Sequence, residues 1–263
     1  MNQQNLDYLK DNLKYMGFGD KLNQQLEKNI QQGFPEFVLK QETEYGKLKL
    51  ESNLHFRKSD QTDLYFFNRH DASLKHPTDN TRDQQQSFYV NKGHGVTLKE
   101  AYNLLDGRAV YKELVNKEGE KYQAWMQLDF NQKDPNGNNK IKQYHENYGF
   151  DLKAQLQQFP IKELGDEQQK QRLEMAMQKG NLQAVTLVKE GKEERLFIEA
   201  NPQYKTLNVY DANLKSLSRE QKTELTVKPE PQQAAKQDVG LKKKEDSLLP
   251  KKRTSQKNGL SIS

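Results

Sequence analysis

The stretch GVTLKEAYNLLDGRAVYKEL, residues 95–114, contains the clearest secondary-structure signals in the chain. Thr97 and Glu100 have the spacing of a capping box, in which two side chains bind backbone N–H groups at the start of a helix. An apolar stripe at helical spacing follows, formed by Leu98, Ala101 and Leu105. Gly107 marks the end of this helix, because glycine adopts the left-handed conformation that helix ends often require. The residues after it, RAVYKEL, are predicted to form a β-strand.

The same order of elements occurs three times along the chain. In each case a short amphipathic helix ends at a glycine and is followed by a strand, a turn and two further strands. The helix-ending glycines are Gly33, Gly107 and Gly180, with spacings of 74 and 73 residues. This near-equal spacing predicts an α+β protein of about three repeated units, each a short helix packed on an antiparallel three-stranded sheet. The alternative is coincidence, since the order helix, glycine, strand is common in α+β proteins.

The predicted units divide the chain into four parts. They are residues 1–92 with N-terminal helices and the first unit, 93–160 with the second unit, 161–221 with the third, and 222–263 as a disordered basic tail. Within the first part, residues 71–86 are predicted to be a polar loop. Within the second, a short helix over residues 151–159 is expected to stop at Pro160. The tail lacks aromatic residues and apolar periodicity, as is typical of disordered segments.

The composition favours several thin hydrophobic cores over one thick core. Only 33% of the 263 residues are hydrophobic and 30% are charged, but 12 Tyr, 11 Phe and one Trp can each bury a large area. The chain has no cysteine, which excludes disulfides and thiolate metal sites and suits a reducing cytoplasm. The N-terminus does not resemble a signal peptide, and no apolar run is long enough to span a membrane. We therefore expect a cytoplasmic protein without membrane contact.

The positive charge of the chain is concentrated at its C-terminal end. The net charge is +5, and residues 222–263 carry ten Lys and Arg against five Asp and Glu, so residues 1–221 are neutral. Two basic clusters are present, namely Lys242, Lys243 and Lys244, and Lys251, Lys252 and Arg253. Such clusters bind phosphate backbones through counterion release, so a nucleic acid is one candidate partner. They equally serve to keep a Gln-rich chain in solution, and both interpretations are open.

The sequence contains no recognisable catalytic or metal-binding motif. The five histidines lack the i, i+4 pairing of helical zinc sites and are interpreted as surface residues. Residues 134–145 resemble a calcium loop, but glycine is missing at position 6 and glutamate at position 12, so a hairpin turn is the better interpretation. NKGHGVT, residues 91–97, lacks the rest of a dinucleotide-binding fingerprint. We predict no catalytic residue, no metal and no cofactor.

The most distinctive remaining stretch is FIEANPQYKTLNVYD, residues 197–211. Its Asn-Pro pair indicates a turn between two strands. Polar side chains around this turn are candidates for a recognition edge, and they are Glu199, Asn201, Gln203, Tyr204 and Lys205. The alternative is a hairpin whose polar side is merely solvated.

Trp125 lies in the predicted strand YQAWMQLDF, residues 122–130. Met126, Leu128 and Phe130 alternate on one face of this strand, so Trp125 points to the other face. Either both faces of the strand are covered, or Trp125 is an exposed contact residue. Burial is the favoured interpretation, because an exposed Trp is uncommon without a partner.

Several of these stretches resemble one protein family. The similar segments are residues 13–33, 64–74, 95–114, 145–152 and 197–211, with the motifs GVTLKEAYNLLDGRAVYKEL, HENYGFDL and FIEANPQYKTLNVYD. They resemble a family of unknown function encoded on conjugative transposons and plasmids of Bacteroidetes. Related modules are fused near the C-terminus of type IA topoisomerases in those bacteria. The resemblance implies work near DNA transfer or processing in a bacterial cytoplasm, and it implies no catalytic residue.

Three functions therefore remain open, of which the third, an enzyme, is supported by no feature of the sequence. The first is a non-catalytic accessory protein of a mobile genetic element that binds nucleic acid or a nucleoprotein complex. The basic tail favours it, whereas the neutral charge of residues 1–221 opposes it. The second is a protein–protein interaction adaptor without DNA contact, for example one that masks a host defence component. The sequence does not indicate an oligomeric state.

Overall fold

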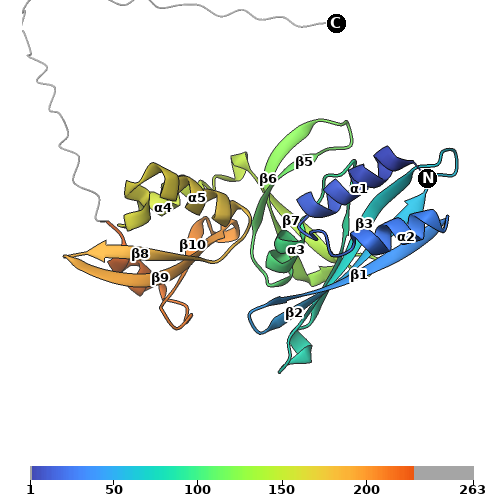
Figure 1. The fold of residues 1–263 in the computed structure, drawn as a ribbon. Helices are drawn as coiled ribbons and strands as arrows, with labels where there is room; N and C mark the ends of the chain where they lie inside the picture. The colour runs from blue at the N-terminus through green and yellow to red at the C-terminus, as the bar shows by residue number, and fades with distance from the viewer. Residues whose placement is uncertain (1, 228–263) are drawn as a thin grey trace, which may run out of the picture. The chain divides into compact units, whose positions relative to one another are not determined.

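The structure is a computed structural model and describes residues 2–227. Figure 1 shows antiparallel sheets with helices packed against them, so the α+β class expected from the sequence is confirmed. The basic clusters at residues 242–244 and 251–253 lie outside the described residues. Within residues 2–227, every helix is too short or too polar to cross a membrane.

The first sheet has four antiparallel strands in sequence order. They are β1 (Glu36–Tyr45), β2 (Leu48–Lys58), β3 (Tyr65–Lys75) and β4 (Gln84–Tyr89). Three helices contact this sheet, namely α1 (Gln3–Tyr15), α2 (Asn23–Gln31) and α3 (Leu98–Leu105). Thr97 and Glu100 form the predicted capping box at the start of α3. Burial alternates along β2, as expected for a sheet with one face in a core.

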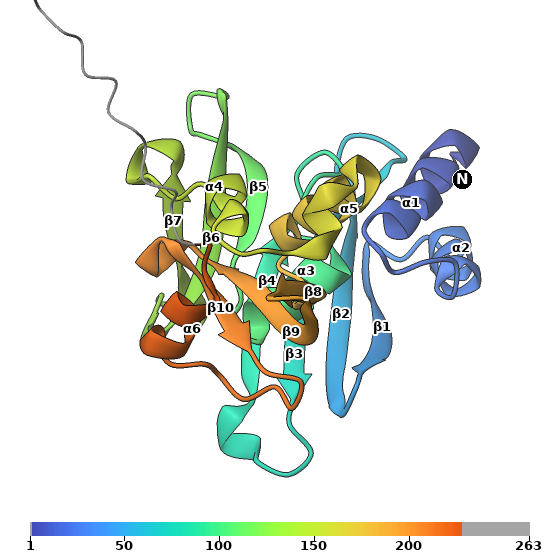
Figure 2. The ribbon, with the colours of Figure 1, turned by 90° about the vertical axis from the view of Figure 1, so that its left-hand side faces the viewer.

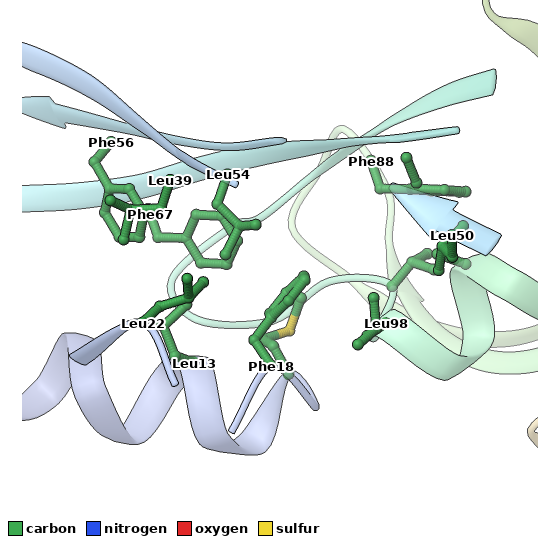
Figure 3. Close-up of a cluster of buried hydrophobic side chains, with 14 of the residues drawn as sticks. Leu13, Phe18, Leu22, Leu39, Leu50, Leu54, Phe56, Phe67, Phe88 and Leu98 are labelled. Atoms are coloured by element: carbon green, nitrogen blue, oxygen red, sulfur yellow. The ribbon is translucent and has the colours of Figure 1, made fainter. Parts of the chain in front are cut away.

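The first core lies between this sheet and its helices (Figure 3). Leu13 of α1 and Phe18 after it face Leu54 and Phe67 of the sheet, and all four are buried. Phe67 also stacks on Phe56 with ring centroids 5.0 Å apart. Burying a side chain of this size contributes about 1.5–3 kcal/mol. This core therefore fixes α1 and the loop after it on the sheet.

The second sheet is covered on both faces. Its strands, in sheet order, are β5 (Val110–Val115), β6 (Lys121–Lys133) and β7 (Asn139–His145). Met126 and Leu128 belong to the first core, whereas Trp125 and Tyr144 on the other face belong to a second core. The predicted burial of Trp125 is confirmed. Phe130 is partly exposed instead of buried, since the pairing of β6 with β7 becomes irregular just before it.

The third sheet has the strand order β10-β9-β8 and packs against two helices. The elements of this region are α4 (Leu152–Gln157), α5 (Glu167–Gln178), β8 (Gln183–Lys189), β9 (Lys192–Asn201), β10 (Thr206–Tyr210) and α6 (Arg219–Leu225), seen from the side in Figure 2. Leu156 of α4 and Met177 of α5 join Ile198 and Leu207 of the sheet in the second core. The connections include four short 3₁₀ helices, which are η1 (Asn80–Arg82), η2 (Glu146–Tyr148), η3 (Lys162–Gly165) and η4 (Pro202–Tyr204).

The three helix-ending glycines are placed as predicted. Gly33, Gly107 and Gly180 follow α2, α3 and α5, and each has a positive φ angle. After Gly107, the N–H of Arg108 donates to the carbonyl of Asn103 at 2.9 Å, which is the bond of a Schellman motif. An internal repeat is not established by the structure, because the first sheet has a fourth strand.

The prediction of a polar loop over residues 71–86 is correct only for residues 76–83, because both ends of the segment belong to strands. β3 extends to Lys75, and Ala72 and Leu74 are buried in the first core. β4 then begins within a run of glutamines. Gln86 is buried, and its side-chain oxygen accepts a hydrogen bond from the backbone N–H of Asn139 at 2.8 Å. A polar side chain can therefore face the inside of a strand when a partner satisfies it.

Two further predictions are corrected at the level of single residues. His70 was interpreted as a surface residue, but it is fully buried on β3. Its Nε2 lies 2.8 Å from the carbonyl oxygen of Val96, which satisfies one of the two ring nitrogens. The tail was expected to begin at residue 222, yet Lys222 lies inside α6, which Ser218 caps.

Candidate functional site

Three aromatic side chains form a row across the second sheet. Trp125 on β6 pairs with Tyr111 on β5 and with Tyr144 on β7. Since directly paired residues point to the same face of a sheet, the three rings lie side by side. Phe150, just before α4, packs edge-on against Trp125 with ring centroids 5.3 Å apart. The four rings create one aromatic surface.

A groove of about 350 Å³ opens over this surface. We call it the aromatic groove and define it by Tyr111, Trp125, Tyr144, Glu146, Phe150 and Glu174. The second sheet, η2, the first turn of α4 and the helix α5 supply its lining. Tyr111 and Phe150 are only partly buried, whereas Trp125 and Tyr144 lie deeper. A concave aromatic surface with a few polar groups is typical of binding sites.

Two carboxylates give the aromatic groove its charge. Glu174 on α5 is buried, and its charged partner among the described residues is the Nζ of Lys153 at 3.6 Å. Glu146 on η2 is exposed and lies close enough to Tyr111 to influence it. Burial, and next the negative charge of Glu146, raise the pKa of the Tyr111 hydroxyl. The hydroxyl of Tyr111 is therefore neutral and able to donate a hydrogen bond at ordinary pH.

The hydroxyl of Tyr144 is buried without a hydrogen-bond partner among the described residues. Burial raises the pKa of this hydroxyl. A buried polar group without a partner costs free energy. Tyr144 therefore carries a donor that nothing in residues 2–227 uses.

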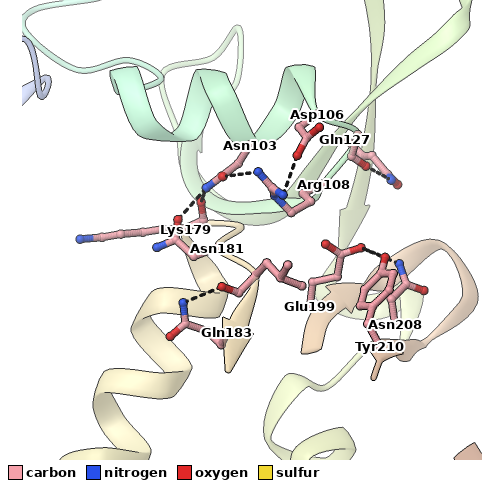
Figure 4. Close-up of polar contacts among 12 residues, drawn as sticks. Asn103, Asp106, Arg108, Gln127, Lys179, Asn181, Gln183, Glu199, Asn208 and Tyr210 are labelled. Atoms are coloured by element: carbon pink, nitrogen blue, oxygen red, sulfur yellow. Dashed lines mark hydrogen bonds and ion pairs between the residues drawn. The ribbon is translucent and has the colours of Figure 1, made fainter. Parts of the chain in front are cut away.

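The predicted recognition edge does not form one surface. Figure 4 shows that Glu199 points inward, where it accepts hydrogen bonds from Asn208 and from the hydroxyl of Tyr210, both at 2.8 Å. Burial, and next the charge of Glu199, raise the pKa of Tyr210 far above its ordinary value. Asn201 donates to Asn208 and also caps η4. These groups satisfy one another inside the third sheet.

The other three residues of the predicted edge lie around η4. The backbone oxygen of Gln203 accepts a hydrogen bond from the Tyr148 hydroxyl at 2.8 Å. The Nζ of Lys205 lies 4.7 Å from the centroid of the same ring. Tyr204 is 71% exposed and is available to a partner. Gln203 and Lys205 connect η4 to η2.

A second polar cluster joins the ends of α3 and α5 (Figure 4). The side-chain amide of Asn103 donates to the carbonyl of Lys179 at 2.6 Å and to the side-chain oxygen of Asn181 at 2.9 Å. Arg108 donates to Asn103 and pairs with Asp106 at 2.7 Å. Asn103 is buried, and the other groups of this cluster bind to it or to one another, so the cluster holds the two helix ends together.

A serine, a histidine and an aspartate also meet on the first sheet. Asp71 lies 2.6 Å from the Nε2 of His55 and accepts a bond of 2.6 Å from the Ser87 hydroxyl. Burial opposes its negative charge, but these two contacts outweigh burial and lower the pKa of Asp71. A hydrolytic triad needs the histidine between serine and aspartate. Here the aspartate is central and the histidine does not contact the serine, so the three residues do not form a hydrolytic triad.

No match was found in comparisons of this chain with protein-family models, curated proteins and solved structures. Across residues 2–227, no group of three or more His, Asp or Glu side chains is arranged to hold a metal ion. Function is therefore inferred from the geometry of the sites.

The sequence did not reveal the aromatic groove as a site. Its residues come from β5, β6, β7, η2, the segment before α4, and α5. Glu146 and Phe150 belong to the motif HENYGFDL, but this motif includes neither the strand residues nor Glu174. One further signal was present, because Trp125 points away from Met126 and Leu128, and a second covered face was one of its two interpretations. The register of the strands then adds Tyr111 and Tyr144 to the row.

Proposed function

We propose that this chain is a non-catalytic binding protein whose aromatic groove takes a short segment of a protein partner. The aromatic groove is the observation that supports this proposal, since it gathers four aromatic rings and two carboxylates in one concavity. Tyr and Trp dominate the binding energy of many protein interfaces, because they bury a large area at a small entropic cost. This function is the protein–protein adaptor of the three that the sequence left open.

The polar groups of the aromatic groove support binding rather than catalysis. Among the described residues, neither Glu146 nor Glu174 shares a side-chain hydrogen bond with a hydroxyl or an imidazole. Such a bond is what activates a nucleophile in covalent catalysis. The carboxylates are instead placed to orient a ligand on the aromatic surface.

Trp125 allows a direct test, because it is the only tryptophan of the chain and lines the aromatic groove. Random peptides displayed on phage are selected on the full-length protein, and enriched peptides are titrated while Trp125 emission is recorded. We expect a saturable change of emission with a Kd in the micromolar range. Tyr111→Ala should abolish it, whereas Tyr89→Ala, at an exposed aromatic residue of the first sheet, should not. Enriched peptides that leave Trp125 emission unchanged would contradict the proposal.

A second candidate function is contact with nucleic acid through the basic tail. The observation that favours it is the distribution of charge, with a net +5 in residues 222–263 and none in residues 1–221. Lysine and arginine clusters bind phosphate backbones without reading sequence. With the family resemblance, this supports an accessory role for a mobile genetic element in a bacterial cytoplasm.

We also propose that the three helix-and-sheet segments arose by repetition of one unit. This proposal is supported by the near-equal spacing and positive φ angles of Gly33, Gly107 and Gly180. Superposition of the segments that follow these glycines tests it. Unrelated paths of the three chains would rule out the repeat.

A further inference from the structure

The negative charge of Glu174 is poorly compensated within the protein. The side chain of Glu174 is only 11% exposed, whereas that of its partner Lys153 is 66% exposed. At 3.6 Å, with one partner in solvent, such a pair compensates little of the cost of burying a carboxylate. Among residues 2–227, no hydrogen-bond donor to the carboxylate of Glu174 is found. The aromatic groove thus contains a largely buried glutamate whose carboxylate accepts no hydrogen bond from the described residues and has one distant ion-pair partner.

We propose that the aromatic groove receives the Lys or Arg side chain of a basic segment in a partner protein. This rests on the proposed function and names the chemistry of the same partner. Glu174 and Glu146 supply carboxylates from α5 and η2, and Tyr111 and Trp125 supply rings. A cationic group is attracted to the faces of aromatic rings. It also forms charge-assisted hydrogen bonds with carboxylates, which are stronger than neutral ones.

Charge complementarity favours this occupant over the alternatives. The lining of the aromatic groove includes three carboxylates, on Glu146, Asp151 and Glu174, against the single ammonium group of Lys153. An acidic side chain is repelled by this excess of negative charge. An apolar side chain excludes water from Glu174 without giving it a partner, which is costly. A Lys or Arg side chain fills the groove and pairs the buried carboxylate at the same time.

Lys153 is an internal competitor for the position of the ligand cation. It lies on the first turn of α4 and is the charged partner of Glu174. Its long exposed side chain can turn into solvent when a ligand cation arrives, because exposed lysines keep most of their rotamer freedom. Removing Lys153 should therefore increase the affinity for a cation, an effect that damage to the fold would not produce.

The test uses short peptides with the sequence acetyl-Gly-Ser-X-Ser-Gly-amide, where X is Lys, Arg, norleucine or Glu. They are titrated into the full-length protein while Trp125 emission is recorded. We expect the Lys and Arg peptides to bind, with the norleucine peptide at least about tenfold weaker, which is the effect expected of a charged hydrogen bond. Glu174→Gln should weaken the Lys peptide by a similar factor, and Lys153→Ala should strengthen it several-fold.

Glu167→Gln is the matched control, because Glu167 is an exposed residue on the same helix as Glu174. It should leave the affinity unchanged, and equal melting temperatures should show that all three variants are folded. Equal affinities for the Lys and norleucine peptides, or no effect of Glu174→Gln, would overturn the cation assignment while the proposed function stands. If no selected peptide changes Trp125 emission, the proposed function itself fails. Emission that depends on protein concentration without peptide would place a second copy in the groove and also overturn the assignment.

Discussion

His70 is a titratable residue in the middle of the first core. Its ring lies 5.4 Å from that of Phe18 and 5.3 Å from that of Phe88, measured between centroids. Burial lowers the pKa of His70 to about 4, and the hydrogen bond to the Val96 carbonyl opposes this only in part. The folded protein therefore holds His70 neutral at pH values where the unfolded chain protonates it.

Because of His70, the protein should become less stable as the pH decreases. The pKa of His70 in the folded protein lies below its ordinary value of 6.5, so its contribution to stability is complete above pH 6.5 and is lost as the pH falls toward 4. We expect the free energy of unfolding to be about 1 kcal/mol lower at pH 5.5 than at pH 7 from this residue. Urea denaturation at both pH values measures it. His70→Gln should be less stable but should lose most of this pH dependence, and an unchanged dependence would assign it to other groups.

Trp125 is buried between the second sheet and the elements of the second core. Trp125→Ala removes its packing against Tyr111 and Phe150 and leaves a cavity. We expect the free energy of unfolding to fall by about 3–5 kcal/mol. Denaturant unfolding followed by circular dichroism measures this loss. A variant as stable as the wild type would mean that Trp125 serves partner binding rather than the core.

At the scale of elements, Gly180 joins the end of α5 to the end of α3. Its φ angle is +77°, and a Cβ at this position would lie 2.8 Å from the Ala109 carbonyl oxygen. Gly33 ends α2 with a φ angle of +72°, but a Cβ there would have nothing within 4 Å. Both alanine variants carry the cost of a left-handed conformation, which is about 1–2 kcal/mol. Overpacking should lower the free energy of unfolding of Gly180→Ala by about a further 1–3 kcal/mol, as measured by thermal or urea denaturation. Equal losses for the two variants would show that the contact with Ala109 is not tight.

The helices were predicted well because their signals are local. The capping box at Thr97 and the glycines after α2, α3 and α5 act within one turn of chain, so these signals do not depend on distant residues. β4 was missed because its glutamines resemble a loop. Its strand pairing depends on β3, and the burial of Gln86 depends on Asn139, which is far away in the sequence.

The candidate site was less predictable than the fold for a related reason. The segment 197–211 attracted attention as a distinctive motif, but Glu199 and Asn208 bind each other instead of a partner. Glu174 looked like one carboxylate among many on a polar helix. Its burial follows from the packing of α5 on the second core, which only the tertiary structure shows.

At the scale of the whole molecule, nucleic-acid binding by the tail can be tested separately from binding in the aromatic groove. A variant that ends at residue 227 serves this purpose. This boundary keeps α6, which ends at Leu225. Each phosphate neutralised on duplex DNA contributes about −0.9 to the log–log salt slope of affinity, so partial engagement of the two basic clusters gives about −2 to −4. Deleting residues 228–263 should remove this part of the slope, as measured by fluorescence anisotropy of labelled DNA at several salt concentrations. An unchanged slope would make the tail a solubility device, and no DNA binding by the full chain at low salt would exclude the candidate.

The coverage of the second sheet on both faces has a consequence for local opening of the protein. Leu128 lies in one core and Trp125, three residues away on β6, lies in the other, so β6 cannot detach without exposing both. The elements packed on the two faces of the second sheet should then open together. Their backbone amides should lose protection from hydrogen exchange as one cooperative unit. In native-state hydrogen exchange, Leu128→Ala should accelerate exchange in β9 nearly as much as in β2. Slow exchange preserved in β9 alone would reveal two independently unfolding halves.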